Sequence, residues 1–185
     1  MVRAGSIQET AMTGSVKLFE DRGWIKDGEY TQEGLIALAE LMGSLQPVHK
    51  GRWGPLFVPL MSKLVPACVE LVIVRDKKVL LTSRNDAYFN GWHTPGTFIG
   101  PDETWQQAAS RAAIRELQCD VVFERYLTSF LQTTGDNLRF AELGSLILCR
   151  IEGDPATGSW FSSMPHDILD HHRKFWPTIA SALDS

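Results

Sequence analysis

The order of apolar and polar residues predicts strands arranged around one central helix. Two aliphatic and β-branched runs, CVELVIVR and VLLTSR, are joined by the polar residues DKK, which is typical of a β-hairpin. Two later runs, VVFERYLTSFLQ and GSLILCRI, flank a polar loop and also predict strands. Between these pairs, TWQQAASRAAIREL predicts a helix whose apolar stripe is Trp105, Ala109, Ala113 and Leu117. This order favours an α/β sandwich built on a mixed sheet.

The residues before the hairpin predict a helical extension. Residues 1–14 are small and polar without periodicity, so we expect a flexible start. Thr31 can cap a helix that ends at Gly43. Its apolar positions, at three-four spacing, are Leu35, Leu38, Ala39 and Met42. The extension should therefore carry one apolar helix face.

Prolines mark both ends of the main domain. Residues 47–66 contain four prolines and two glycines, which predicts an irregular connector laid over apolar surface. Near the C-terminus, Pro165 is expected close to a helix N-terminus and Pro177 at a kink. The predicted organisation is a flexible start (1–14), a helical extension with its connector (15–65) and the main domain (66–185).

Composition narrows the possible partners. The chain has 185 residues, 44% of them hydrophobic, and a formal net charge of −4 with both signs interspersed. It has no lysine and arginine cluster of the kind that nucleic-acid binding requires, so we expect no nucleic-acid partner. No apolar run approaches the roughly 18 to 20 residues that span a bilayer, and the first residues do not resemble a signal peptide. We therefore expect no membrane partner.

The cysteines indicate the compartment. Cys68, Cys119 and Cys149 are odd in number, lack metal-ligand spacing and lie in apolar surroundings. Buried thiols in a reducing compartment fit these features better than a disulfide does. The expected location is the cytoplasm.

The segment GWHTPGTFIGPDET before the central helix is rich in turn residues. Its glycines and prolines predict a tight, irregular loop that exposes backbone groups. Asp102 and Glu103 then precede the helix, where its dipole favours negative charge, and helix capping is the simplest interpretation of Asp102. Glu103 is eight residues from Arg111, so the two can pair only if the loop folds back. Loop carbonyls and Glu116 could converge on one magnesium or manganese ion, which would polarise a phosphate.

This segment resembles the Nudix box, whose pattern is G-x5-E-x7-R-E-U-x-E-E-x-G-U with U apolar. With Thr97 in the glycine position, Glu103, Arg111 and Glu116 fall on the first glutamate, the arginine and the last glutamate. The resemblance extends over residues 66–152 and more weakly over the C-terminal helix. It implies an α/β/α sandwich of Nudix type with a mixed sheet, a loop-helix-loop site and, here, an N-terminal helical extension.

The box also departs from the family pattern. Ala112 and Arg115 replace two of the three helix glutamates, and Gln118 replaces the closing glycine. An alternative register takes Arg115 and Glu116 as the Arg-Glu step and Asp120 as the last acid, but it needs extra loop residues. The first register matches more of the motif.

The reduced box is similar to that of GDP-mannose mannosyl hydrolases, which keep a single final glutamate. This resemblance implies that Glu116 and a carbonyl of Thr97 bind magnesium, with manganese possible in its place. It also places Arg84 on the diphosphate. Arg115 could either turn outward into a surface salt bridge or supply charge in place of a metal ion.

Histidines and a tryptophan complete the list of candidates. The resemblance implies a histidine base outside the box, and PHDILDHHR supplies His172, held near carboxylates. His171 and His172 point about 100° apart on a helix, so at most one should face the site. His93 and Trp92 lie in the loop and could contact the substrate, although core packing is the more common role of a tryptophan.

The sequence thus predicts a magnesium-dependent Nudix-type hydrolase of a nucleoside diphosphate derivative, above all a nucleotide sugar. The alternative is a non-catalytic Nudix domain that binds a nucleotide or a protein partner, because Ala112 and Arg115 replace carboxylates. Residues 31–65 could cover the side of the main domain or join two chains into a homodimer.

Overall fold

The computed structural model describes residues 16–47, 56–86, 88–136 and 139–184. The chain divides into two compact units, Met1–Gln46 and Pro47–Ser185. The flexible start predicted for residues 1–14 lies outside the described residues.

The described part of the first unit contains a helical segment at residues 16–21, a short hairpin and one longer helix. Strands β1 (Ile25–Lys26) and β2 (Glu29–Tyr30) pair antiparallel, and helix α2 spans Gln32–Ser44. Thr31 caps α2 as predicted, because its side chain accepts a hydrogen bond from the N–H of Gly34. The helix continues past Gly43, which does not adopt the positive φ that would end it there.

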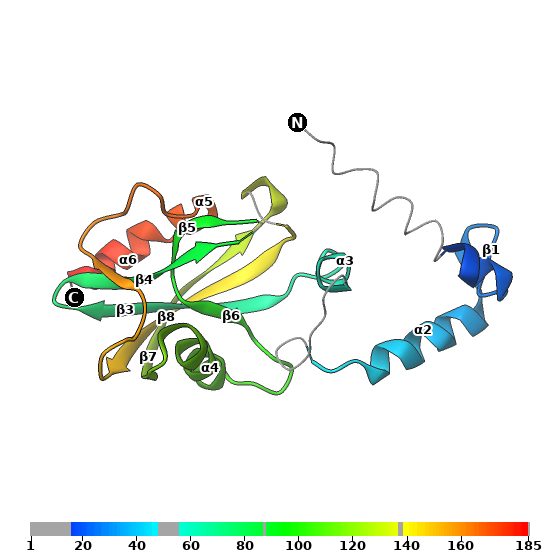
Figure 1. Ribbon diagram of the computed structural model, residues 1–185, viewed down its shortest axis with the longest axis horizontal. Coiled ribbons are helices and arrows are strands. Elements are labelled where there is room, and N and C mark those ends of the chain that lie inside the picture. Colours follow the sequence, from blue (N-terminus) through cyan, green and yellow to red (C-terminus); the bar gives the residue numbers. More distant parts are fainter. Residues whose placement is uncertain (1–15, 48–55, 87, 137–138, 185) are drawn as a thin grey trace. The chain divides into compact units, whose positions relative to one another are not determined.

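The second unit is built on a mixed sheet (Figure 1). Its strands are β3 (Ala67–Arg75), β4 (Lys78–Asn85), β5 (Asn90–His93), β6 (Gly96–Phe98), β7 (Asp120–Gln132), β8 (Glu142–Glu152) and β9 (Ser159–Phe161). The order is β5-β4-β3-β8-β7, with β6 paired to β3 and β9 paired to β4. β3 and β8 run parallel and the other pairs run antiparallel. The predicted mixed α/β architecture is confirmed.

The hairpin of β3 and β4 turns through two residues. Asp76 and Lys77 have φ values of 51° and 56°, the left-handed conformation that two-residue hairpin turns require. Val74 lies opposite Val79, and Lys78 already belongs to β4. The predicted three-residue turn is therefore one residue shorter.

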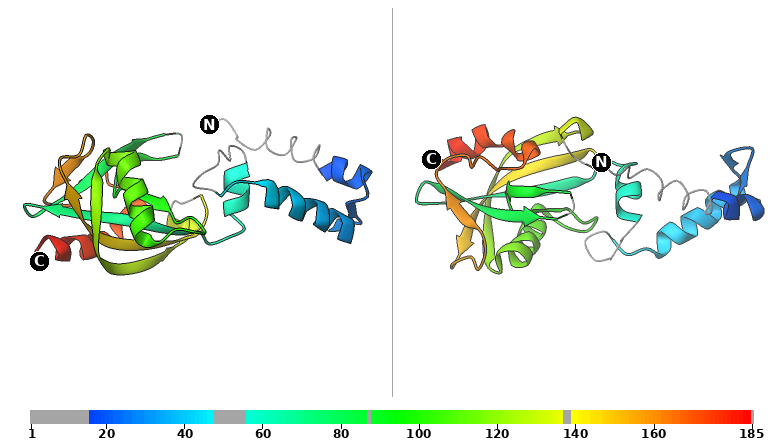
Figure 2. Two further views of the ribbon diagram at one scale, coloured as in Figure 1. Left: turned by 90° about the horizontal axis from the view of Figure 1, so that it is seen from below. Right: turned by 45° about the horizontal axis from the view of Figure 1, so that its top comes forward.

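Helices cover both faces of this sheet (Figures 1 and 2). Helix α4 (Trp105–Leu117) packs on one face through buried alanines and Leu117. Helices α5 (Asp170–Arg173) and α6 (Trp176–Leu183) lie on the opposite face, where Phe175 and Ile179 are buried. Trp105 departs from the predicted apolar stripe, because it is 38% exposed and stacks on Tyr126 at a ring distance of 5.1 Å.

Pro177 acts differently from the prediction. Pro177 lies in the first turn of α6, where its missing N–H costs nothing, so it begins a helix and does not kink one. Pro165 precedes the N-terminus of α5 by five residues. Within the predicted connector, residues Phe57–Met61 form a short helix, α3.

The three cysteines form no disulfide. Cys68 and Cys149 are buried, Cys119 is intermediate, and all three are free thiols. Burial raises the pKa of Cys149 to about 12.

Among the described residues, no helix combines the length and apolar character needed to cross a membrane.

Candidate functional site

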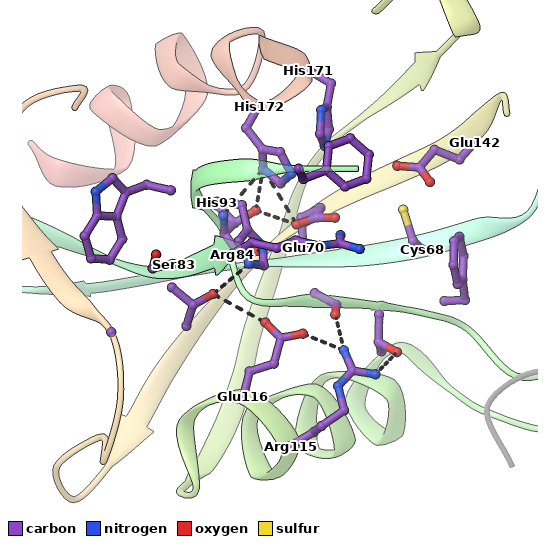
Figure 3. Close-up of a pocket in the computed structure, with 18 of the residues that line it drawn as sticks. Cys68, Glu70, Ser83, Arg84, His93, Arg115, Glu116, Glu142, His171 and His172 are labelled. Carbon is purple, nitrogen blue, oxygen red and sulfur yellow. Dashed lines mark hydrogen bonds and ion pairs between the residues drawn. The ribbon is translucent and has the colours of Figure 1, made fainter. Parts of the chain in front are cut away.

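A cavity of about 780 Å³ opens between the sheet, α4 and α5 (Figure 3). Its volume lies within the usual range of small-molecule sites. The polar residues that line it include Glu70, Thr82, Arg84, His93, Thr94, Thr97, Arg111, Arg115, Glu116, Arg139, Glu142, His171 and His172. The cavity therefore collects most of the residues predicted to form the site.

Glu103 and Arg111 form the predicted fold-back pair. Arg111 donates from Nε to Oε1 of Glu103 at 2.7 Å and from Nη2 to Oε2 at 2.6 Å. The loop reaches this position because Thr104 caps α4 in a capping box with Gln107. Arg111 also donates to the carbonyl of Phe98 at 2.7 Å. The pair thus ties the start of α4 to β6, and Glu103 itself does not line the cavity.

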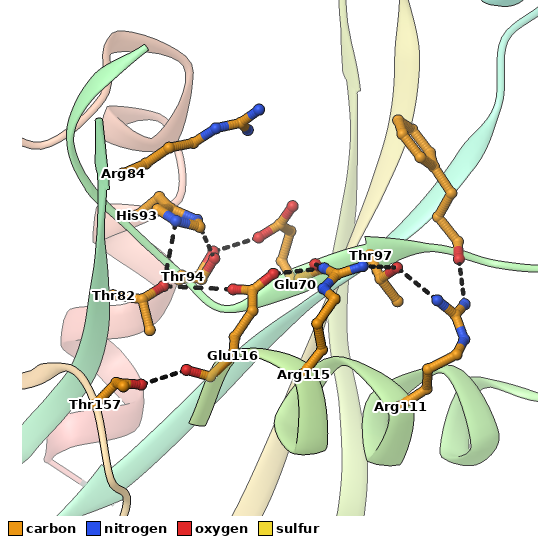
Figure 4. Close-up of polar contacts among 12 residues, drawn as sticks. Glu70, Thr82, Arg84, His93, Thr94, Thr97, Arg111, Arg115, Glu116 and Thr157 are labelled. Atoms are coloured by element: carbon orange, nitrogen blue, oxygen red, sulfur yellow. Dashed lines mark hydrogen bonds and ion pairs between the residues drawn. The ribbon is translucent and has the colours of Figure 1, made fainter. Parts of the chain in front are cut away.

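Arg115 extends from α4 across to β6 (Figure 4). Its Nη2 donates to the carbonyl of Gly96 at 2.7 Å and to Oε1 of Glu116 at 2.5 Å. Its Nη1 donates to Oγ1 of Thr97 at 3.2 Å. Of the two predicted orientations, the side chain therefore takes the one that points into the site.

Thr97, whose carbonyl was predicted as a metal ligand, contacts α4 through its hydroxyl. Thr97 lies opposite Val69 in the β3–β6 ladder and offers its hydroxyl to Arg111 and Arg115. The carbonyl that meets Arg115 belongs to Gly96. A Cβ at residue 96 would lie 2.7 Å from the backbone carbonyl oxygen of Val69, which cannot move aside easily, so glycine is required for this close approach.

Glu116 has both carboxylate oxygens engaged. Oε1 pairs with Arg115, and Oε2 lies 3.4 Å from the hydroxyl of Thr82. Its backbone carbonyl accepts a hydrogen bond from Thr157. The side chain is 18% exposed, so the carboxylate borders the cavity from a fixed position.

A divalent metal ion does not fit these oxygens while Arg115 holds them. Magnesium demands near-octahedral coordination by oxygen. The carboxylate of Glu116, a predicted metal ligand, and the carbonyl of Gly96, next to the predicted Thr97, both accept from the Arg115 guanidinium. Residues 112 and 115 add no carboxylate. Among the described residues, no group of three or more His, Cys, Asp or Glu side chains could hold an ion.

His93 presents an unprotonated nitrogen near Glu116. Its Nδ1 lies 2.8 Å from the carbonyl of Thr94, which can only accept, so Nδ1 carries the proton. Nε2 is 3.2 Å from Oγ1 of Thr82, which also approaches Glu116. Burial lowers the pKa of His93, although the charge of Glu116 opposes the shift. Nε2 is therefore a free base at neutral pH.

His172 belongs to a more deeply buried network. Its Nδ1 is 3.0 Å from Oγ1 of Thr94, which in turn hydrogen bonds to Oε2 of Glu70. Burial lowers the pKa of His172 well below its usual range and raises the pKa of Glu70 well above its own. Burial therefore favours the neutral form of both groups. His171 lines the cavity as well, so both adjacent histidines border it, whereas the sequence predicted at most one.

The predicted substrate contacts Arg84 and Trp92 also lie at the cavity. Arg84 donates from Nε to Asp86 at 2.5 Å, and its guanidinium lies 4.6 Å from the ring centre of Phe89. Trp92 packs edge-on against Phe161 at 4.9 Å and contacts the core around α6. Arg84 is thus held by its neighbours at the rim, while Trp92 is largely a core residue.

Sequence reasoning missed an aromatic wall of the cavity. Phe57 from α3 lies 5.9 Å from Phe98 and 5.7 Å from Phe140. The Arg139 guanidinium lies over the rings of Phe57 and Phe140. No motif connects these positions, since they come from three distant segments. Glu70 was also missed, although a lone acid within the apolar run CVELVIVR is a signal of a partnered or functional carboxylate.

Several solved structures share this fold. An ADP-ribose pyrophosphatase from Streptococcus suis is 21% identical, with a TM-score of 0.53 over 66% of this chain and 94% of that one. A MutT NUDIX hydrolase from Burkholderia pseudomallei is 20% identical, with a TM-score of 0.54 over 62% and 98%. A MutT protein from Methanosarcina mazei is 16% identical, with a TM-score of 0.54 over 65% and 96%.

At these identities the solved structures establish the fold alone. The comparison with curated proteins gives no match. The profile of the NUDIX domain matches residues 66–183, well over half of the chain and the whole of the sheet and its covering helices. The Nudix box, the fold and this match agree: the chain belongs to the Nudix domain family.

Proposed function

We propose that this protein hydrolyses a nucleoside diphosphate derivative, with a nucleotide sugar as the leading candidate. The observation that carries the proposal is the convergence of Arg84, Arg115, Glu116 and His93 on one cavity with an aromatic wall. Two guanidinium groups suit a diphosphate, and the aromatic rings suit a base or sugar. The nucleotide sugar follows from the similarity of the reduced box to that of GDP-mannose mannosyl hydrolases.

The residues divide between binding and proton transfer. Arg84 and Arg115 would neutralise the diphosphate, and Arg111 with Glu103 would hold the loop in place. A water would attack phosphorus or the sugar carbon and pass its proton to Glu116 or His93, while the phosphate oxygen leaves with the bonding electrons. His93 supports this role better than the predicted His172, because its Nε2 lies beside Thr82 and Glu116.

Magnesium is the cofactor that the family resemblance implies. The resemblance assigns Glu116 and a loop carbonyl as its ligands, which is a set that the observed Arg115 contacts do not fit. Since Arg115 occupies both oxygens, we derive no step from a bound ion. Cytoplasmic location also stays a proposal, supported by the three free thiols.

The proposal is tested by measuring phosphate and sugar release from a panel of nucleoside diphosphate sugars and dinucleotides, with magnesium and with chelator. Glu116→Gln should lower turnover by about 10²-fold or more, because it removes the carboxylate. Glu124→Gln, at an exposed residue of β7 outside the cavity, is the matched control. Unchanged turnover in Glu116→Gln would refute the assignment of this residue.

A second candidate function is nucleotide binding without catalysis. The Arg115–Glu116 pair favours it, because it neutralises the one carboxylate that the box retains on α4 at the cavity. Thermal shifts with nucleotides, combined with no turnover across the panel, would select this candidate. Turnover of any panel member would exclude it.

A further inference from the structure

Arg115 is held in one place by acceptors from two elements. Its guanidinium bonds to the carbonyl of Gly96, the hydroxyl of Thr97 and the carboxylate of Glu116. Adjacent residues on a helix point about 100° apart, so an ordinary surface arginine would not bend back onto its own neighbour and β6. Three acceptors hold the guanidinium of Arg115 in one position, whereas a single exposed ion pair would leave the side chain free to move.

These acceptors are of the types that bind a hard metal ion. Carbonyl, hydroxyl and carboxylate groups all offer oxygen atoms, which are the ligand atoms that hard divalent cations take. Here they meet a guanidinium, and the carboxylates that would raise the negative charge are replaced at residues 112 and 115. Ala112 is fully buried in the hydrophobic core and does not line the cavity. The local charge is therefore one carboxylate balanced by one fixed cation.

The guanidinium also has donors left for a ligand. An arginine has five N–H groups, of which Nη2 uses two and Nη1 uses one in these contacts. The side chain is 53% exposed and lines the cavity. Nε and the second Nη1 hydrogen can therefore donate to an anion, with Arg84 lining the same cavity.

We propose that Arg115 is a permanent cation at the position of the divalent ion, and that it binds the substrate's diphosphate directly. That the bound anion is a diphosphate rests on the proposed function. That Arg115 takes the place of the divalent ion does not. The protein therefore binds diphosphate in the absence of divalent metal. Restoring a carboxylate at residue 115 converts the same oxygens into a metal site.

The first test uses manganese alone, followed by electron paramagnetic resonance. Wild type should show no manganese binding below millimolar concentration. Arg115→Glu should bind manganese at least tenfold more tightly, because the introduced carboxylate, the carboxylate of Glu116 and the Gly96 carbonyl would then converge. Arg125→Glu makes the same charge change at an exposed position outside the cavity and should bind as weakly as wild type. Thermal unfolding verifies that each variant is folded.

The second test uses inorganic pyrophosphate in the presence of chelator, measured by calorimetry. Wild type should bind it, Arg115→Gln should bind at least tenfold more weakly, and Arg115→Lys should fall between them. Manganese binding by wild type, no manganese gain in folded Arg115→Glu, or pyrophosphate binding that requires metal would each overturn the proposal. Neither test measures turnover, so an inactive substrate panel would refute the proposed hydrolysis and leave both results interpretable.

Discussion

Arg111 reaches back across eight residues to form a two-point ion pair with Glu103, at 2.7 and 2.6 Å. Glu103 also accepts from the N–H of Gly100 at 2.8 Å, and Arg111 donates to the carbonyl of Phe98. One pair of side chains therefore fixes the loop that carries Gly96 and Thr97 against α4. The ion pair should therefore contribute to the stability of the fold.

Glu103→Gln should destabilise the protein by about 1 to 3 kcal/mol, because it leaves a partly buried arginine without its charged partner. Urea unfolding measures this loss. The matched control is Asp154→Asn, whose pair with Arg75 is exposed and should contribute at most about 1 kcal/mol. Equal effects of the two substitutions would mean that the Glu103 pair has no special structural role.

The network of Glu70 and His172 predicts a dependence of stability on pH. Burial raises the pKa of Glu70, so the native state keeps a proton that the unfolded state loses above the ordinary pKa of 4.5. The stability that this provides is complete below pH 4.5 and is lost as the pH rises toward the raised pKa. Burial lowers the pKa of His172, so its contribution is lost as the pH falls below 6.5.

Glu70→Gln isolates the pH-dependent contribution of Glu70 to stability, because glutamine can still accept the hydrogen bond from Thr94 and does not titrate. The unfolding free energy of the variant minus that of wild type should increase as the pH rises from 4.5 to 8. Urea unfolding at several pH values measures the difference, in which the His172 term largely cancels. A difference that stays constant with pH would show that the pKa of Glu70 is not raised in the native state.

The sequence predicted the parts of this site that depend on local spacing. The hairpin, α4 and the fold-back of Glu103 onto Arg111 follow from periodicity and from the Nudix box. The direction of the Arg115 side chain could not be predicted from the sequence, because it depends on where β6 places the carbonyl of Gly96. A motif identifies residues that share a short segment, whereas a side chain's direction depends on tertiary neighbours.

Arg84 should contribute to the binding of a diphosphate. Arg84→Gln should weaken binding of nucleoside diphosphates about tenfold and reduce its dependence on salt, because one charged donor is lost. Calorimetry at two salt concentrations measures both effects. Arg75→Gln, outside the cavity, should leave both unchanged. Equal binding by wild type and Arg84→Gln would place the diphosphate elsewhere.

Dimerisation through the extension stays a prediction that α2 makes testable. This helix exposes four large apolar side chains, at 40 to 53% of their accessible surface: Leu35, Ile36, Leu41 and Met42. Light scattering should give a dimer for the full chain and a monomer for a version that lacks residues 1–46. A monomer in both cases would remove the homodimer.

Phe57 should contribute to binding of the nucleoside part of the ligand. It reaches the cavity from α3, outside the segment matched to the family, and packs against Phe98 and Phe140. Phe57→Ala should weaken nucleotide binding about tenfold and leave pyrophosphate binding unchanged, because it removes an aromatic surface and no charge. Leu64→Ala, at an exposed residue of the same connector, is the control.

Truncation gives an independent measurement of the same contact. A version lacking residues 1–46 keeps α3 and should bind nucleotide as the full chain does. A version lacking residues 1–65 loses Phe57 and should bind nucleotide as weakly as Phe57→Ala, with pyrophosphate binding retained. If it binds nucleotide normally, the base lies away from α3. If it loses pyrophosphate as well, the connector supports the fold of the cavity, and Phe57 then acts through structure and not through contact with the ligand.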